Sequence, residues 1–279
     1  MKHLFFKLCL LALFLFLATG SAVASPAGPV REIKPSLVDP EVLATIFSGY
    51  EYLHYSVSWS GGIKIGDIYL VIHPESTEDG AYHISAKVKD YGPLRLIYPV
   101  NDTFDCFVRG PMKLPYLYKV HQIEGRGSRE IRRTTWYDQE LGQIRYQRNE
   151  NEPELFDVDG PVYNEFAAFI ITRALTFKEG EAMIVPAFAD GKRHEVRVNK
   201  LGKETRSTLF GEVQTLKIEP RLQFKGLYDK SGATVLWLTD DACRIPVSIQ
   251  SRIVIGSLTA ELVDYSNTAC TELSAEPAS

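Results

Sequence analysis

The period of the hydrophobic pattern changes near Tyr50, and this change constrains the fold more than any other feature of the sequence. Downstream, apolar and polar residues alternate, as in the run Leu53, Tyr55, Val57 and Trp59. In an extended chain, side chains two positions apart face the same side of a sheet. Comparable runs, each bounded by turn residues, occupy 68–72, 82–88, 196–199 and 249–262. The pattern predicts on the order of a dozen or more short antiparallel strands.

Two segments keep helical spacing instead. Asp39-Pro40 combines an N-cap residue with proline at the first helical position, which predicts a short helix ending near Gly49. After Gly160, large apolar residues recur at three- and four-residue steps, which predicts a helix over 161–177. This second helix is apolar around most of its circumference and must be covered on most sides.

The fold class that follows is mainly β. We expect a large antiparallel sheet over residues 50–268, curled into an open or split barrel around one buried helix, with a short N-terminal helix before it. A pair of small β domains divided near Gly160 is the alternative. Residues 25–49 are expected to form a flexible leader and the short helix, and 269–279 a polar tail.

Residues 1–24 have the layout of a secretory signal peptide. Lys2 and Lys7 precede an apolar run over 8–18, and small residues then lead to a cleavage site between Ala24 and Ser25. The run is shorter than the roughly 20 residues that a membrane span needs. We therefore expect a mature, periplasmic chain that begins at Ser25 and has no transmembrane span.

The charge of the mature chain excludes one class of partner. Loss of Lys2 and Lys7 leaves 29 basic against 35 acidic side chains, a net charge of −6. Nucleic-acid binding depends on a basic surface, so no nucleic-acid partner is expected. An oxidising compartment permits a disulfide among Cys106, Cys243 and Cys270, and the spacing leaves all three pairings open.

The sequence offers no catalytic or metal motif. No two of the five mature histidines have the helical spacing that a metal site favours. A G-x-S-x-G nucleophile motif is absent. Asp159 is expected to cap the second helix, and Asp240-Asp241 to build a turn, rather than to act as acid–base pairs. No catalytic residue, metal or cofactor is predicted.

Arginines near residue 130 are the most unusual feature. In an extended strand Arg129 and Arg133 share a face with Ile131 and Tyr137, so charges interrupt a core face. Arginine beside aromatic residues suits anionic ligands. The candidate ligand-binding residues are Arg129, Arg133, Arg173, Trp59 and Tyr55. The alternative is that these charges protect an edge strand or form internal ion pairs.

Several segments resemble a known family. They are Gly49–Trp59, the helix segment Phe166–Arg173, the stretch Trp237–Val247 and Ile255–Leu258. In this order and spacing they are similar to the bacterial domain-of-unknown-function family 3108, over residues 49–265. The resemblance implies an exported protein with a curled antiparallel sheet, similar to lipoprotein-carrier envelope proteins. It implies no activity and no catalytic residues.

The function expected from these features is non-enzymatic. The chain is expected to bind, or to help assemble, an amphiphile or glycan of the cell envelope, with an anionic lipid or an acidic glycan as ligand. The first alternative is a hydrolase or lyase of envelope polysaccharide. The second is a structural domain that binds another envelope protein.

Overall fold

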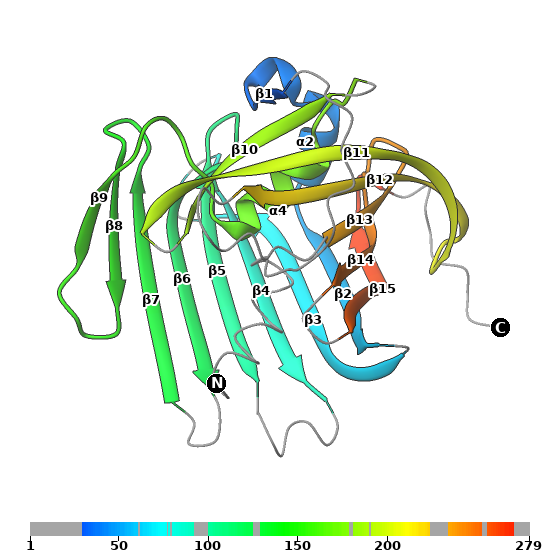
Figure 1. Cartoon of the computed structure of the whole chain (residues 1–279), viewed down its shortest axis with the longest axis horizontal. Helices are drawn as coiled ribbons and strands as arrows, with labels where there is room; N and C mark the ends of the chain where they lie inside the picture. The colour runs from blue at the N-terminus through cyan, green and yellow to red at the C-terminus, as the bar shows by residue number, and fades with distance from the viewer. Residues whose placement is uncertain are drawn as a thin grey trace.

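A single open sheet dominates the structure. The computed structural model describes residues 30–60, 62–76, 78, 80–91, 100–124, 129–178, 181–189, 191–223, 234–252 and 256–270. Within these ranges fifteen strands pair in the order β1-β10-β11-β12-β13-β14-β15-β2-β3-β4-β5-β6-β7-β8-β9. All neighbours are antiparallel except β1 and β10, and the end strands β1 and β9 do not pair with each other. The predicted mainly β fold is therefore confirmed, as one large sheet that is not closed into a barrel (Figure 1).

The first half of the chain contributes β1 Val30–Glu32, the 3-10 helix η1 Pro35–Leu37, α2 Pro40–Ile46, β2 Glu51–Trp59, β3 Ile63–Pro74, β4 Tyr82–Asp90, β5 Asn101–Arg109, β6 Leu114–Glu124, β7 Arg129–Asp138, β8 Gln143–Arg148 and β9 Glu154–Asp157. The second half contributes α4 Glu165–Arg173, β10 Ala182–Ala189, β11 Lys192–Thr208, β12 Gly211–Gln223, β13 Thr234–Thr239, β14 Pro246–Arg252 and β15 Ser257–Asn267.

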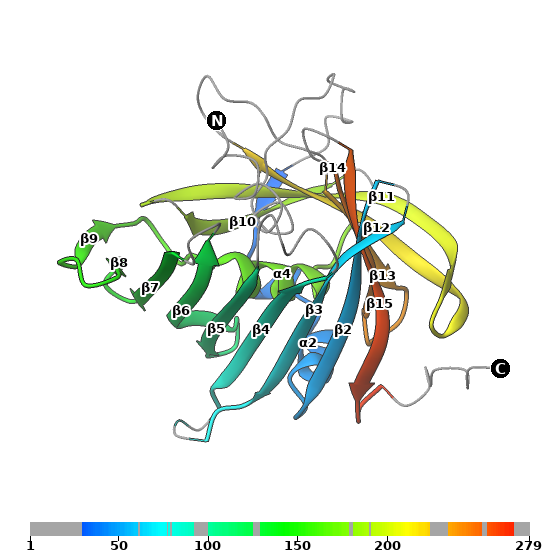
Figure 2. The same ribbon diagram turned by 90° about the horizontal axis from the view of Figure 1, so that it is seen from below.

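The sheet bends so that its two halves lie on either side of α4. Strands β2–β9 form one wall, and β10–β12 pass across the other side of the helix (Figures 1 and 2). The pairing of β15 with β2, for example Ala260 with Val57, joins the segments before and after Gly160 in one sheet. Along β2, residues are buried alternately, as the period-2 pattern predicts. Phe166 of α4 is buried against Phe104 of β5, with ring centroids 5.1 Å apart.

The helices begin where local capping places them. Asp39 accepts hydrogen bonds from the backbone N–H groups of Glu41 and Val42, so the predicted cap of α2 is confirmed. The cap of α4 is Asn164, whose Oδ1 accepts from the Ala167 N–H at 2.8 Å. The prediction of Asp159 as this cap was wrong, and α4 is shorter than the predicted 161–177.

Both ends of the β domain are more ordered than the sequence suggested. The predicted flexible leader is corrected over residues 30–38, where β1 pairs with β10 and where Leu37 and Val38 are buried. At the other end Cys270 is buried and forms a disulfide with Cys243, which ties the start of the predicted polar tail to the domain. The predicted signal peptide, with Ala24 and Ser25, lies outside the described residues.

Cys106 is a buried free thiol. Cys106 on β5 is fully buried, and the side-chain amide of Asn164 donates to its Sγ at 3.0 Å. Burial raises the pKa of this thiol far above its usual range. The disulfide pairing that the sequence left open is therefore Cys243 with Cys270. The Cys106 thiol stays protonated at neutral pH and is a poor nucleophile.

Candidate functional site

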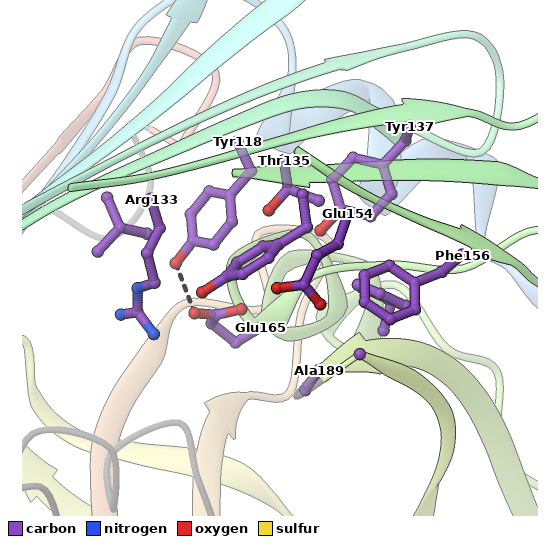
Figure 3. A pocket seen from close by; sticks show the side chains of 12 residues that line it. Tyr118, Arg133, Thr135, Tyr137, Glu154, Phe156, Glu165 and Ala189 are labelled. Atoms are coloured by element: carbon purple, nitrogen blue, oxygen red, sulfur yellow. Dashed lines mark hydrogen bonds between the residues drawn. The ribbon is translucent and has the colours of Figure 1, made fainter. Parts of the chain in front are cut away.

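A pocket of about 290 Å³ lies between the wall of strands β6–β9, the start of α4 and the end of β10. Figure 3 shows Arg133 at one end, Phe156 at the other, and Glu154 and Glu165 between them. The lining residues are Tyr118, Val120, Arg133, Thr135, Tyr137, Tyr146, Glu154, Phe156, Glu165, Phe188, Ala189 and Gly191.

Strand register assembles the polar side of the pocket. Tyr118 of β6 pairs with Thr135 of β7, which pairs with Tyr146 of β8, which pairs with Glu154 of β9. Directly opposed residues in a sheet project their side chains from the same face. One cross-strand row therefore brings three hydroxyl groups and a carboxylate to the pocket.

Helix α4 supplies the second carboxylate. Glu165 is the first residue of the helix and accepts a hydrogen bond from the Tyr118 hydroxyl at 2.5 Å (Figure 3). A carboxylate in the first helical turn interacts favourably with the helix dipole. The cap at Asn164 fixes where this turn begins, so it also fixes the position of Glu165 against β6.

A contact between two aromatic rings closes the far end of the pocket. The strands that carry these rings, β9 and β10, do not pair in the described sheet. Phe156 of the edge strand β9 packs against Phe188 of β10, with ring centroids 5.4 Å apart. Gly191 has a φ of +74°, and a Cβ atom there would lie 2.9 Å from the Phe156 ring. Glycine at 191 thus permits both the turn after β10 and the close approach of Phe156.

Arg133 has unused hydrogen-bonding capacity. Its Nη2 donates to the Gln122 side-chain oxygen, and Gln122 in turn donates to Asp102 at 2.8 Å. Its Nε is buried and has no hydrogen-bond partner. Within the described part of the chain, no ion pair joins Arg133 to Glu154 or Glu165, although all three line the pocket. Because Nε is shielded from solvent, a bound molecule would contact the part of the guanidinium group that lines the pocket.

Two tyrosines of the pocket, Tyr118 and Tyr137, are neutral donors. Burial, with the negative charge of Glu165 adding to it, raises the pKa of Tyr118 well above 10.0. Burial likewise raises the pKa of Tyr137 well above 10.0, again with Glu165 adding to it. At physiological pH both phenols therefore keep their protons and offer them to an acceptor.

Arg133 is the one proposed ligand-binding residue whose side chain the structure places at the pocket. For Arg129 the structure describes the backbone, which pairs with Glu124, and not the side chain. Trp59 is half-buried at the end of β2, with its indole nitrogen close to Gly256. Tyr55 is buried and donates to the Pro246 carbonyl at 2.8 Å.

Arg173 does not line the mouth of a groove, and that part of the prediction is corrected. Its side chain is fully buried and forms two hydrogen bonds with Glu51, at 2.6 and 2.8 Å. It also donates to the backbone carbonyls of Cys243 and Arg244. Tyr265 donates its hydroxyl to Glu51 at 3.0 Å. Four hydrogen bonds thus engage Arg173 inside the protein, and the bidentate pair with Glu51 supplies two of them.

Sequence reasoning missed most of the lining. The alternation that placed Arg133 and Tyr137 on one face also places Thr135 there, and a complete period-2 reading would have added it. Glu165 lies within the predicted helix 161–177 and is in the first turn of α4. Glu154 and Phe156 lie on the four-residue strand β9, whose sequence gave no clear alternation.

Elsewhere the titratable side chains form local networks. His83 contacts Asp105 at 2.8 Å and His73 at 3.1 Å, and Asp241 accepts from the backbone N–H groups of Cys243 and Arg244 as a turn residue. In the described ranges no three His, Cys, Asp or Glu side chains are grouped to hold a metal ion. A helix of the length and apolarity needed to cross a bilayer does not occur there either.

Comparison with known proteins bears on the fold and the family. No curated protein matches the chain. A crystal structure of a β-barrel-like protein of the domain of unknown function DUF1849, from Brucella abortus, is similar, with a TM-score of 0.57 and 9% sequence identity. The match covers 79% of this chain and 98% of that one, and at this identity it shows the fold alone. The family model described as "Protein of unknown function (DUF3108)" matches residues 54–263, so the predicted resemblance is confirmed and the chain belongs to this family.

Proposed function

We propose that this protein is exported to the periplasm and there binds, without chemical conversion, an amphiphile or glycan of the cell envelope. The observation that carries the proposal is the concave pocket at Arg133. It combines an arginine guanidinium group, two carboxylates and several aromatic rings around a volume of about 290 Å³. Pockets that bind small molecules join apolar walls to a few fixed polar groups in this way.

A binding role suits the pocket better than catalysis. A tyrosine that acts as a base needs a lowered pKa, whereas the pKa values of Tyr118 and Tyr137 are raised. Glycoside hydrolysis needs one carboxyl group that is protonated and one that is ionised. Glu165 accepts a hydrogen bond at a helix N-terminus, which suits a carboxylate, and Glu154 is exposed to water.

The second candidate is the hydrolase or lyase, because Glu154 and Glu165 line the same pocket. Incubation with envelope polysaccharides would distinguish the two. The binding proposal expects no product above the level of a Glu154→Gln, Glu165→Gln double variant. Product release that the wild type shows and the double variant lacks would replace binding with catalysis.

The proposed function is tested on protein purified from the periplasm of cells that express the full chain. We expect an N-terminus at Ser25 and a small molecule that co-purifies and is identified by mass spectrometry. In Ala189→Trp, a bulky side chain fills the pocket and the bound molecule should be lost. Arg132→Gln is the control, because Arg132 is exposed and pairs with Glu130. An intact Met1, or the same small molecules in wild type and Ala189→Trp, would contradict the proposal.

A further inference from the structure

We infer that the pocket at Arg133 takes an uncharged sugar unit of a glycan, in preference to an anionic lipid or an acidic glycan. The inference rests on the proposed function and specifies the ligand class of the same site. It follows from the charge balance of the pocket, the arrangement of its donors and acceptors, and its size.

The charge balance disfavours an anionic ligand. Among the lining residues that the structure describes, Arg133 is the one cation, whereas Glu154 and Glu165 are both acidic. The sequence predicted an anionic ligand because several arginines were expected to lie at one groove. Arg173 is instead buried outside the pocket and paired with Glu51. An anion in the pocket would gain one attractive and two repulsive interactions. Like charges at short range in a partly desolvated site are costly.

The donors and acceptors match a hydroxyl-rich molecule. The guanidinium group of Arg133 lines the pocket as a donor, and among the described residues it forms no ion pair with either pocket carboxylate. Glu154 and the second oxygen of Glu165 offer acceptors. Each hydroxyl group of a sugar both accepts and donates. Neighbouring sugar hydroxyls can thus bridge Arg133 and a carboxylate that do not reach each other, and neither an acyl chain nor a phosphate group supplies such donors.

The walls and the volume fit one sugar ring. Tyr146, Phe156 and Phe188 present rings to the pocket, and aromatic faces pack well against the C–H faces of sugars. A volume of about 290 Å³ lies at the small end of the roughly 300–1,000 Å³ typical of ligand pockets. A single ring with its substituents fits this space, and the rest of a glycan would extend past the exposed Glu154.

The test is a panel of probes on the purified mature protein. A glycan array carries neutral and uronic-acid-containing glycans, and phosphatidylglycerol vesicles test the lipid class by co-sedimentation. We expect wild type to bind neutral glycans in preference to both acidic probes. Arg133→Gln should lower the affinity for the best neutral glycan roughly tenfold to a hundredfold, the loss expected for a hydrogen bond from a charged group. Arg132→Gln should bind as wild type does.

Glu165→Gln sharpens the result, because it keeps an acceptor for Tyr118 and removes one negative charge. The ratio of acidic-glycan to neutral-glycan affinity should rise in this variant. Unchanged stability in urea confirms that each variant is folded.

Preference of wild type for uronic-acid glycans or for the vesicles, abolished by Arg133→Gln, would overturn the inference and leave the proposed function standing. A co-purified small molecule without glycan binding would do the same. Failure of every probe, with no co-purified molecule, would overturn both.

Discussion

Arg133 and Arg173 are both charged residues inside a largely apolar β domain, yet the structure uses them differently. Arg173 is fully buried and has Glu51 and two backbone carbonyls as acceptors. Arg133 is half-buried, donates to Gln122, forms no ion pair among the described residues and lines a cavity. Burial and charge alone therefore do not mark a binding residue. Hydrogen-bonding capacity left unused beside open space is the better criterion.

The largest effect on the free energy of unfolding should come from removing the cation of the buried Arg173–Glu51 pair. Arg173→Gln leaves Glu51 buried without its cation, which typically costs about 3–5 kcal/mol of unfolding free energy. Urea denaturation followed by fluorescence measures this loss. The comparison variant Arg133→Gln should change the unfolding free energy by less than about 1 kcal/mol, as is usual for a partly exposed charge. Equal losses in the two variants would remove the distinction between the two arginines.

Removal of the disulfide should have the next largest effect on the free energy of unfolding. The disulfide belongs to the region of Arg173. Cys243 contributes a carbonyl to Arg173, and its bond to Cys270 closes a loop with a sequence separation of 27. The double variant Cys243→Ser, Cys270→Ser should lose about 3 kcal/mol of unfolding free energy. Binding at the pocket should persist under conditions in which the variant is folded. Loss of binding in the folded variant would show that the two regions are coupled.

Gly191→Ala, in the region of Arg133, should have a smaller effect on the free energy of unfolding. Gly191 and Gly110 both have positive φ, +74° and +72°, but a Cβ at 110 meets nothing within 4 Å. Each alanine variant should lose about 1 kcal/mol from backbone strain. Only Gly191→Ala should also weaken ligand binding, because its Cβ displaces the Phe156 ring. Calorimetric titration measures the binding, and equal affinities in the two variants would show that Phe156 does not shape the pocket.

The smallest effect concerns pH. Because burial raises the pKa values of Tyr118 and Tyr137 above 10.0, both phenols stay protonated as the pH rises from 7 to 9. Folding raises the pKa of each tyrosine, so the contribution of the tyrosine to the free energy of unfolding is complete below the pKa of the unfolded chain. That contribution is lost as the pH rises through the pKa of the folded chain. Ligand affinity should therefore be constant between pH 7 and 9. An affinity that falls with a midpoint in this window would show that a pocket tyrosine ionises there.

The parts of the fold that depend on local pattern could be predicted from the sequence. Alternation identified β2, β3, β4, β11, β14 and β15 and placed Arg133 inward on β7, and Asp39 marked the start of α2. The ion pair of Arg173 could not be predicted, since its partner Glu51 lies 122 positions away in the sequence and meets it only when the sheet curls around α4. The contact between Tyr118 and Glu165 depends on the same curling.

The cap of α4 shows a second limit. Asp159 and Asn164 are both good capping residues, and the sequence offers no reason to choose the later one. In the structure Asn164 is fully buried, and its side-chain amide also contacts Cys106 of β5. Tertiary packing therefore decides where the helix begins, and with it the position of Glu165 in the pocket.

Native mass spectrometry of protein purified from the periplasm of expressing cells is the sharpest test of binding at Arg133, because it counts bound molecules on each variant. We expect one bound molecule in wild type and in Arg132→Gln, and none, or far less, in Arg133→Gln. A bound mass that Arg133→Gln retains at the wild-type level would contradict the assignment of the site. The absence of any bound mass in wild type, together with failure of every glycan and vesicle probe, would contradict binding itself.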